Sequence, residues 1–285
     1  MAIEPERTRP PRAGRVDRVL VGRYAADGTT RRSPDNLIVE EPLAIELDGV
    51  RVATTMRTPG HDFELAAGFC FTDGLLAGAP VLRCRYCGTG SAYDTDYNVV
   101  TVHTGGRAPT PTARLTTTSS SCGLCGSTTI DELGARLDPL SGVEPFPLDL
   151  LVELPERAGE HQPLFERTGA VHAAAAFDRA GEMVLLREDI GRHNAVDKVV
   201  GSLLLEGRLD AVDGRRPTAE MALYVSGRAS FEMVQKAWAA GFAAVVAVSA
   251  PSALAVRTAN LAGLQLVGFV RQGRMNVYAP GASAS

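Results

Sequence analysis

Between residues 171 and 278, short apolar runs alternate with helical segments of about ten residues, and this rhythm constrains the fold more than any other feature. Strands joined through helices of this length imply βαβ units around a largely parallel sheet that is buried on both faces. We therefore predict an α/β domain. Its expected strands are 171–177, 183–187, 222–225, 242–248, 264–270 and 275–278, and its expected helices are 193–206, 231–240 and 253–262.

The first half of the chain predicts a smaller α+β region. Asp48-Gly49 lies at the centre of the alternating segment 43–56, which is typical of a type I′ hairpin. Further along the chain we expect a helix over 62–76 capped by Asp62, strands at 81–87 and 97–103, an exposed loop at 104–121, a helix at 129–137 and a Pro-interrupted linker at 141–168.

This pattern divides the chain into four parts. We expect a mobile tail with one strand (16–24) over residues 1–36, and an N-terminal α+β domain over 37–158. A C-terminal α/β domain follows over 159–279, and residues 280–285 form a short tail.

Composition excludes several classes of function. The formal net charge of −4 does not favour nucleic-acid binding, and no apolar run approaches the length of a membrane span. Residues 1–15 lack the apolar core of a secretory signal, so a soluble, cytoplasmic protein is expected. Lysine occurs only at Lys198 and Lys236, so binding of anions would fall to the 27 arginines, although a bias of the genome also explains this ratio.

Four of the five cysteines form two Cys-x-x-Cys pairs, Cys84 with Cys87 and Cys122 with Cys125. A four-cysteine zinc site is one interpretation, but 34 residues separate the pairs, against about 15–20 in the usual ribbon. The fifth, Cys70, falls on the apolar stripe of its expected helix and should be an inert core residue.

The second pair has the better case for reactivity. Gly123 and Gly126 flank it and let the backbone bend, and a helix is expected to start shortly after it. The positive end of that helix would lower the pKa of the Cys122 thiol. Disulfide exchange and carriage of a sulfur atom both fit such a thiolate.

Polar, glycine-rich segments follow several of the expected strands. In open α/β sheets, ligands bind outside the carboxyl ends of the strands, where helix N-termini and arginines can hold phosphate groups. We therefore predict a site for an anionic, nucleotide-like ligand, although each segment taken alone could be an ordinary surface loop. The candidate residues are His172, Asp189, Gly191, Arg192, His193, Ser226, Arg228 and Ser249, with Arg271 and Arg274 beside the last core strand.

Other polar residues of these segments have simpler interpretations. Asp189 could accept a hydrogen bond from a base or a ribose, whereas Glu232, Gln235 and Lys236 are interpreted as a solvated helix face. Although His172 starts a pattern similar to that of zinc nucleotide deaminases, these enzymes need a glutamate two residues later and a downstream Pro-Cys-x-x-Cys. Position 174 is alanine and both cysteine pairs lie upstream, so we assign no metal ligand and expect no deaminase chemistry.

Five motifs occur in an order that resembles the formate dehydrogenase accessory sulfurtransferases, the FdhD family. They are Ser-Cys-Gly-Leu-Cys-Gly (121–126), His-Ala-Ala-Ala (172–175), Glu-Asp-Ile-Gly-Arg-His-Asn-Ala-Val-Asp-Lys (188–198), Ser-Gly-Arg-Ala-Ser-Phe-Glu-Met-Val-Gln-Lys (226–236) and Val-Gly-Phe-Val-Arg-Gln-Gly-Arg (267–274). The resemblance extends from about residue 38 to 278.

The resemblance implies a cytoplasmic homodimer with a cytidine-deaminase-like second domain. Its implied function is to accept persulfide sulfur from a cysteine desulfurase and transfer it to the molybdenum bis-guanine-dinucleotide cofactor of formate dehydrogenase, with GDP as a partial mimic of that cofactor. Cys122 would hold the persulfide and Cys125 would assist. Contacts to the cofactor would come from Phe269, Val270, Arg271, Gln272, Gly273 and Arg274.

Cys84 and Cys87 are not part of that family pattern. A nucleotide-binding zinc or redox module that uses both pairs therefore stays an alternative, as does a cofactor chaperone without sulfur transfer.

Overall fold

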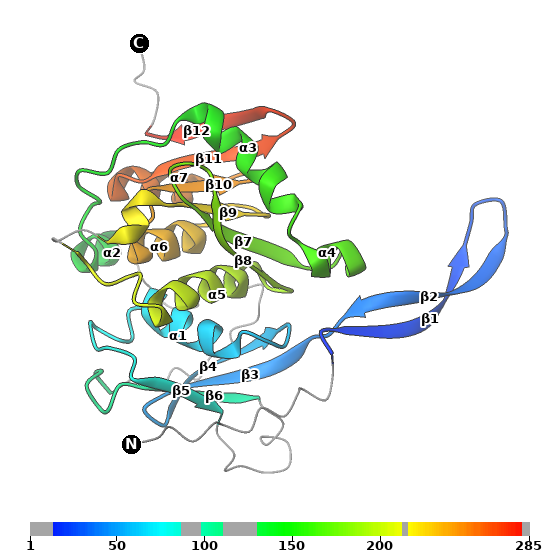
Figure 1. The fold of residues 1–285 in the computed structure, drawn as a ribbon, viewed down its shortest axis with the longest axis horizontal. Helices are drawn as coiled ribbons and strands as arrows, with labels where there is room; N and C mark the ends of the chain where they lie inside the picture. The colour runs from blue at the N-terminus through cyan, green and yellow to red at the C-terminus, as the bar shows by residue number, and fades with distance from the viewer. Residues whose placement is uncertain (1–13, 87–97, 111–129, 213–215, 281–285) are drawn as a thin grey trace.

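The computed structural model describes residues 14–86, 98–110, 130–212 and 216–280 (Figure 1). Cys87, Cys122 and Cys125 lie outside these ranges. The described residues form three sheets of six, four and two strands.

The largest sheet has the strand order β12-β11-β10-β9-β7-β8. Its strands are β7 (His172–Phe177), β8 (Met183–Asp189), β9 (Ala222–Val225), β10 (Ala244–Ala247), β11 (Gln265–Arg271) and β12 (Arg274–Ala279). β9, β10 and β11 are parallel and are linked by helices, as the alternation predicts. The flanking pairs β11–β12, β7–β9 and β7–β8 are antiparallel, because hairpins supply the outer strands, so the sheet is mixed.

Helices cover both faces of this sheet (Figure 1). The apolar sides of α5 (Arg192–Leu205), α6 (Phe231–Ala240), α7 (Ala253–Ala262) and α2 (Ile130–Arg136) pack on one face. On the other face, Leu151 and Leu154 of α3 (Leu148–Gly159) contact a second core cluster that includes Ala175 and Tyr224. Successive side chains of a strand point to opposite faces of the sheet. Because apolar helices cover both faces, every position of these strands is apolar, which explains the continuous apolar runs of the sequence.

The four-stranded sheet has the order β4-β3-β6-β5 and forms the next layer of the molecule. Its strands are β3 (Glu41–Leu47), β4 (Val50–Arg57), β5 (Arg83–Tyr86) and β6 (Val99–His103). Asp48 and Gly49 both have positive φ angles, 48° and 88°, which confirms the predicted hairpin turn. Helix α1 (Asp62–Thr72) lies between this sheet and α5 (Figure 1).

Glycines bring α1 and α5 into backbone contact. A Cβ atom on Gly68 would lie 1.9 Å from the Asp197 carbonyl oxygen, and one on Gly201 would lie 1.8 Å from the Glu64 carbonyl oxygen. No residue with a side chain fits either position, so these two glycines set the distance between the two layers.

Three local expectations are corrected. Residues 25–36 are not all tail, because β2 (Thr30–Ile38) pairs with β1 (Val16–Tyr24) over nine positions. The segment 141–168 is not a bare linker, because Pro147 and Pro163 stand at the starts of α3 and α4 (Pro163–Thr168), where a helix needs no N–H group. Asp62 does not cap α1; His61 holds that place, and the Asp62 carboxylate instead bonds Arg57.

Candidate functional site

The carboxyl ends of β9, β10 and β11 form one continuous edge with the start of β7 and the end of β8, which we call the ligand edge. Backbone hydrogen bonds join its loops: Ser226 N to the Ala173 oxygen at 2.9 Å, Ser249 N to the Gly227 oxygen at 3.2 Å, and Phe269 N to the Ser249 oxygen at 3.2 Å. The prediction that the polar segments after these strands share one edge is therefore confirmed. This prediction rested on the rule that ligands of open α/β sheets bind outside the carboxyl ends of the strands.

His172 lies at the centre of the ligand edge. The Ser226 hydroxyl oxygen accepts a hydrogen bond from Ala173 N at 2.9 Å and lies 3.3 Å from His172 Nδ1, with which it forms a second hydrogen bond. Burial, followed by Arg192 and His193, lowers the pKa of His172 below 6.5. A neutral imidazole donates from one ring nitrogen and accepts at the other, so His172 can form a hydrogen bond to a ligand through the nitrogen that does not face Ser226.

Arg192 lies beside this histidine, and Arg228 is close enough to Arg192 for its charge to act on it. Arg192 is the first residue of α5 and is partly buried, and its Nε has no hydrogen-bond partner in the part of the chain that the structure describes. Burial and then the charge of Arg228 lower the pKa of Arg192. Two such cations side by side are the arrangement that phosphate oxygens satisfy.

The start of α6 adds further polar groups. His193 Nε2 lies 3.8 Å from a Glu232 carboxylate oxygen, and this histidine is the main reason that the pKa of Glu232 falls to about 2. Within the described ranges, two more buried atoms lack hydrogen-bond partners: Ser230 Oγ at the N-terminal cap of α6, and Gln235 Oε1 about one turn further along the helix. Buried polar atoms without partners are uncommon, and a bound ligand would satisfy them.

Asp189 does not have the role that the sequence suggests. Its side chain is fully buried, and its Oδ1 accepts from Gly191 N at 2.8 Å and from Asn194 Nδ2 at 3.0 Å. Its Oδ2 accepts from Thr58 N at 3.1 Å and lies 2.7 Å from Lys198 Nζ. With four internal partners, Asp189 fixes the loop that carries Arg192 and leaves no lone pair for a base or ribose.

The two lysines of the chain are both buried, whereas the sequence analysis interpreted Lys236 as part of a solvated helix face. Lys198 Nζ bonds the Thr58 oxygen at 2.9 Å in addition to Asp189. Lys236 Nζ bonds both Asp197 carboxylate oxygens and Thr72 Oγ1, each at 2.9 Å. Gln235 is buried as well, so the solvated-face interpretation of α6 is wrong.

The segment Phe269–Arg274 leaves the ligand edge as the β11–β12 hairpin. Phe269 has a φ of 53° and is 39% exposed, which aims its ring out of the sheet. Gln272 and Gly273 form the turn with positive φ angles, and Arg271 and Arg274 are exposed on either side of it. Val270 is an exception to the predicted contacts, because it is fully buried in the core.

The described cysteines show no activation. Burial raises the pKa of Cys84 to about 12 and raises that of Cys70 well above its usual value. The described ranges contain no cluster of His, Cys, Asp and Glu suited to a metal ion, and Cys87, Cys122 and Cys125 fall outside them.

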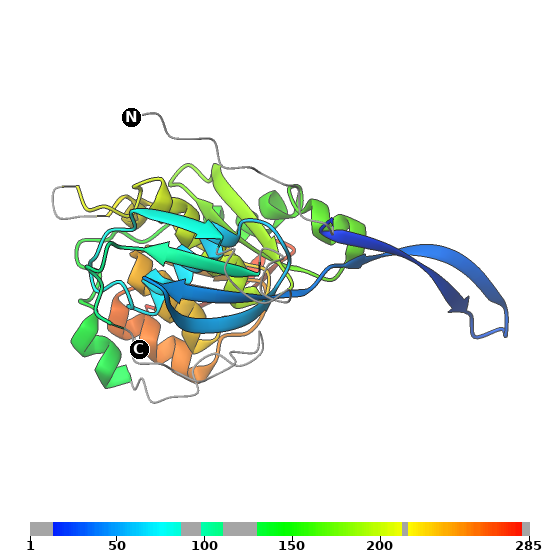
Figure 2. The ribbon, with the colours of Figure 1, turned by 90° about the horizontal axis from the view of Figure 1, so that it is seen from below.

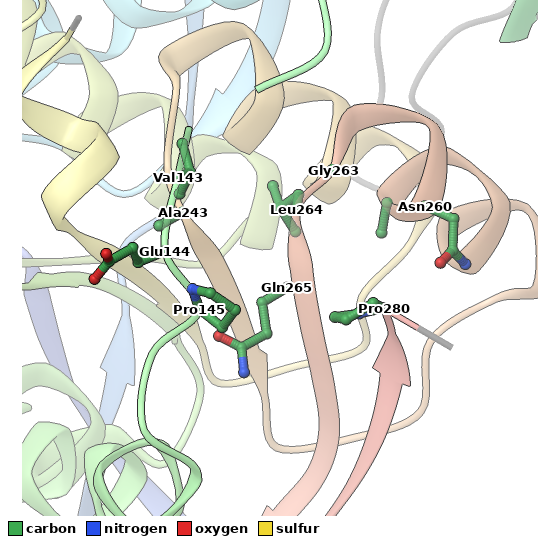
Figure 3. A pocket seen from close by; sticks show the side chains of 10 residues that line it. Val143, Glu144, Pro145, Ala243, Asn260, Gly263, Leu264, Gln265 and Pro280 are labelled. Atoms are coloured by element: carbon green, nitrogen blue, oxygen red, sulfur yellow. The ribbon is translucent and has the colours of Figure 1, made fainter. Parts of the chain in front are cut away.

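A hollow of about 110 Å³ lies at the opposite edge of the six-stranded sheet (Figure 3). Glu144, Asn260, Gln265 and Pro280 are among the residues that line it. The Gln265 amide binds the backbone of Phe146, from which it accepts at 2.7 Å and to which it donates at 3.2 Å. Because Ala243, Leu264 and Gln265 lie at the amino ends of β10 and β11, the hollow is separate from the ligand edge at their carboxyl ends.

Comparison with known proteins decides the family. The model of the FdhD/NarQ family matches residues 38–283. The chain belongs to the FdhD/NarQ family. The ligand edge and the buried lysines lie inside the part that matches the family, whereas β1 and most of β2 lie outside it.

Relatives extend the likeness over most of the chain. The protein named sulfur carrier protein FdhD of Streptomyces avermitilis is 48% identical over 263 residues, which cover 89% of this chain and 90% of that protein. The protein of the same name from Anaeromyxobacter dehalogenans strain 2CP-C is 49% identical over 261 residues, covering 87% and 88%. The solved structure of a protein described as a formate dehydrogenase accessory protein, from Desulfotalea psychrophila, shares the fold, with a TM-score of 0.70 and 24% identity over 95% of this chain and 99% of that one.

No helix in the described ranges has both the length and the apolar character that crossing a membrane requires.

Proposed function

We propose that this chain is a cytoplasmic sulfur carrier that helps to mature a formate dehydrogenase. Cys122 accepts sulfur from a cysteine desulfurase and transfers it to the molybdenum bis-guanine-dinucleotide cofactor that the apoenzyme receives. Membership of the family and the names of its relatives support carriage of sulfur. The basic cluster on the ligand edge supports binding of the cofactor's nucleotide ends.

Loading of sulfur is a thiol exchange. The Cys122 thiolate attacks the outer sulfur of the persulfide on the desulfurase, a new S–S bond forms on Cys122, and the desulfurase cysteine leaves as a thiolate. No external oxidant is needed, because the transferred sulfur keeps its oxidation state. Cys125 assists by holding or passing on the same sulfur atom.

The observation that carries the cofactor proposal is the partly buried Arg192, which lies beside His172 and close to the charge of Arg228. Arg192 is partly buried and loses part of its hydration there, so a diphosphate gains charge-assisted hydrogen bonds in place of water. Ser230 Oγ adds an unsatisfied polar atom at the N-terminal cap of α6, where part of a nucleotide can form a hydrogen bond with it.

Intact-protein mass spectrometry tests the loading step. The purified chain is incubated with a cysteine desulfurase and L-cysteine, and we expect a gain of about one sulfur atom that a reducing agent removes. Cys122→Ser should abolish the gain and Cys125→Ser should reduce it. Cys84→Ser is the matched control and should load normally, because burial keeps that thiol protonated. Loading that survives Cys122→Ser but not Cys84→Ser would show that Cys84 is the carrier.

Calorimetric titration with GDP tests the ligand edge. Replacing Arg192 or Arg228 by alanine should weaken binding by roughly ten- to a hundredfold, the typical effect of losing a charge-assisted hydrogen bond. Arg257→Ala, an exposed change on α7, is the control and should bind as the parent does. Equal affinity in all four proteins would exclude the arginine pair from the site.

A further inference from the structure

The backbone that carries Arg192 is held from another layer of the molecule. The four-stranded sheet and α1 form the N-terminal layer, which packs on α5 from the side opposite the six-stranded sheet (Figures 1 and 2). Residues 58–61 join β4 to α1, and we call them the platform loop. This loop contacts the short connection between β8 and α5, where the ligand edge passes into Arg192.

Thr58 of the platform loop makes this contact with its N–H, its hydroxyl and its carbonyl oxygen. The N–H donates to Asp189 Oδ2 at 3.1 Å, and the hydroxyl oxygen accepts from Ile190 N at 3.1 Å. The carbonyl oxygen accepts from Lys198 Nζ at 2.9 Å. Thr58 is buried, so water does not compete for these bonds. One residue of the N-terminal layer thus holds the end of β8, the connection and the second turn of α5.

Asn194 adds a second link between the same two parts. Its Nδ2 donates to the Met56 oxygen at 2.8 Å and to Asp189 Oδ1 at 3.0 Å, and its Oδ1 accepts from Thr55 Oγ1 at 3.2 Å. Asn194 is buried in the first turn of α5, directly after Arg192 and His193. The end of β4 therefore fixes the start of the helix that Arg192 begins.

The platform loop is itself closed at its base. Arg57 and Asp62 stand directly before and after it, and their buried side chains bond each other at 2.9 and 3.1 Å. Gly60 N bonds the same carboxylate at 3.2 Å. A loop braced in this way can keep a neighbouring segment at a defined position.

Arg192 depends on this support for its place beside His172. A Cβ atom on Gly227 would lie 3.5 Å from two atoms of the His172 ring and 3.8 Å from Arg192 Cδ, so both side chains border Gly227. Arg192 Nε makes no hydrogen bond within the described ranges, so the position of the guanidinium follows the backbone that carries it.

We propose that Thr58 and Lys198 are positioning residues of the ligand edge, which hold the start of α5 where Arg192 can meet a phosphate group. This inference rests on the proposed binding of a nucleotide diphosphate at that edge. Both residues are buried, so they act through the backbone of the connection and through Asp189, which lies 2.7 Å from Lys198 Nζ. The N-terminal layer then takes part in binding without touching the ligand.

The other end of α1 supplies matched controls. Thr72 is the last residue of α1, and its hydroxyl bonds Asp197 at 2.8 Å and accepts from Lys236 Nζ at 2.9 Å. Thr72 and Lys236 are buried and join the N-terminal layer to α5 and α6, as Thr58 and Lys198 join it to β8 and α5. Their bonds, however, do not reach the connection before Arg192.

Calorimetric titration with GDP compares the two threonines in isosteric variants. Thr58→Val removes one hydrogen bond to Ile190 N and should weaken binding by about three- to tenfold, the usual effect of losing one neutral hydrogen bond. Thr72→Val should bind GDP as the parent does, although urea unfolding should show that it is less stable.

The two lysines give the larger effect in the same titration. Lys198→Met leaves the Asp189 carboxylate without its cation and should weaken GDP binding by about tenfold or more, because the start of α5 is displaced. Lys236→Met also leaves a buried carboxylate without its cation, but it should retain the parent's affinity in whatever fraction of the protein is folded.

Titration of His172 by NMR reports the position of Arg192 without any ligand. Burial and then the charge of Arg192 lower the pKa of His172. Thr58→Val changes no charge, so we expect a higher pKa of His172 in this variant only because the guanidinium lies farther from the ring. Thr72→Val should leave the pKa of His172 unchanged.

Two results would overturn the proposal. One is a Thr58→Val protein that binds GDP as tightly as Thr72→Val and keeps the parent's pKa at His172. The other is an equal loss of affinity in Lys198→Met and Lys236→Met, which would mean that both lysines only stabilise the fold. A parent that binds no GDP would refute the cofactor proposal instead, and the pKa of His172 would then decide whether Thr58 positions Arg192.

Discussion

Replacing Gly201 by alanine would force α1 and α5 apart where their backbones touch. The added Cβ would lie 1.8 Å from the Glu64 carbonyl oxygen, and this backbone atom cannot move by a change of side-chain rotamer. To reach even 3.0 Å, the two helices must separate by roughly 1.2 Å. That displacement moves the whole four-stranded layer relative to α5.

The cost follows from the contacts that cross between the layers. Overpacking of this kind costs about 1–3 kcal/mol, and each buried hydrogen bond that is lost adds about 1–3 kcal/mol. The bond from Thr72 to Asp197 (2.8 Å) and the bond from Thr58 N to Asp189 (3.1 Å) both join the N-terminal layer to α5 or its leading loop. If one of these bonds is lost, we expect Gly201→Ala to lower the free energy of unfolding by about 2–6 kcal/mol, a large part of the total for a protein of this kind.

Urea unfolding followed by far-ultraviolet circular dichroism measures this change. Gly134→Ala is the control: it is also a helical glycine, but its added Cβ would lie 3.5 Å from the nearest atom, an ordinary contact. It should be neutral or slightly stabilising. The glycines do not set the layer spacing if the free energy of unfolding of Gly201→Ala stays within about 0.5 kcal/mol of the parent value and its dependence on urea concentration is unchanged.

Three further predictions concern single side chains. Lys236→Met should lower the free energy of unfolding by about 3–5 kcal/mol in the same assay, because it leaves the Asp197 carboxylate buried without its cation. A loss of stability smaller than that of the exposed change Arg257→Ala would contradict this prediction. The pKa of Glu232 is lowered to about 2, so its contribution to stability is complete above about pH 4.5 and is lost as the pH falls towards 2. In Glu232→Gln, the free energy of unfolding should fall less steeply than in the parent as the pH drops from 4.5 to 2. An equally steep fall in both proteins would refute the pairing with His193. Cys84 should resist iodoacetamide at pH 8 in the native protein, because burial raises its pKa to about 12, and peptide mass mapping that finds it alkylated as fast as in the unfolded chain would disprove this.

The sequence predicts the buried parts of the fold well, because burial of one or both faces of a helix or strand imposes a regular pattern of apolar residues. The strands β9 and β10 are apolar at every position since both faces of the sheet are covered, and the strand-end rule then locates the ligand edge. β2 carries no such signal. It contains Pro34 and two arginines and covers no core, so no alternation marks it.

The remaining errors concern partners that lie far apart in the chain. Lys236 looks solvated from its own helix, because its partners Thr72 and Asp197 come from α1 and α5. Asp189 looks like a ligand residue because its loop is polar, but Thr58 and Lys198 occupy it from two other elements. Local spacing cannot show such contacts.

The bonds that cross between the layers determine how the chain unfolds. Glu64 of α1 holds Arg187 of β8 through two bonds of 2.6 and 2.9 Å, and Lys198 reaches the backbone of Thr58. If the four-stranded layer detached alone, Glu64 would lose Arg187, and Lys198 would lose its bond to Thr58. Charged groups without these partners would then remain on the surface of each separated layer. Partial unfolding therefore costs nearly as much as complete unfolding, and the two layers should melt in a single cooperative transition. Neither half of the chain is then a separate folding unit, although each has its own sheet and its own apolar core.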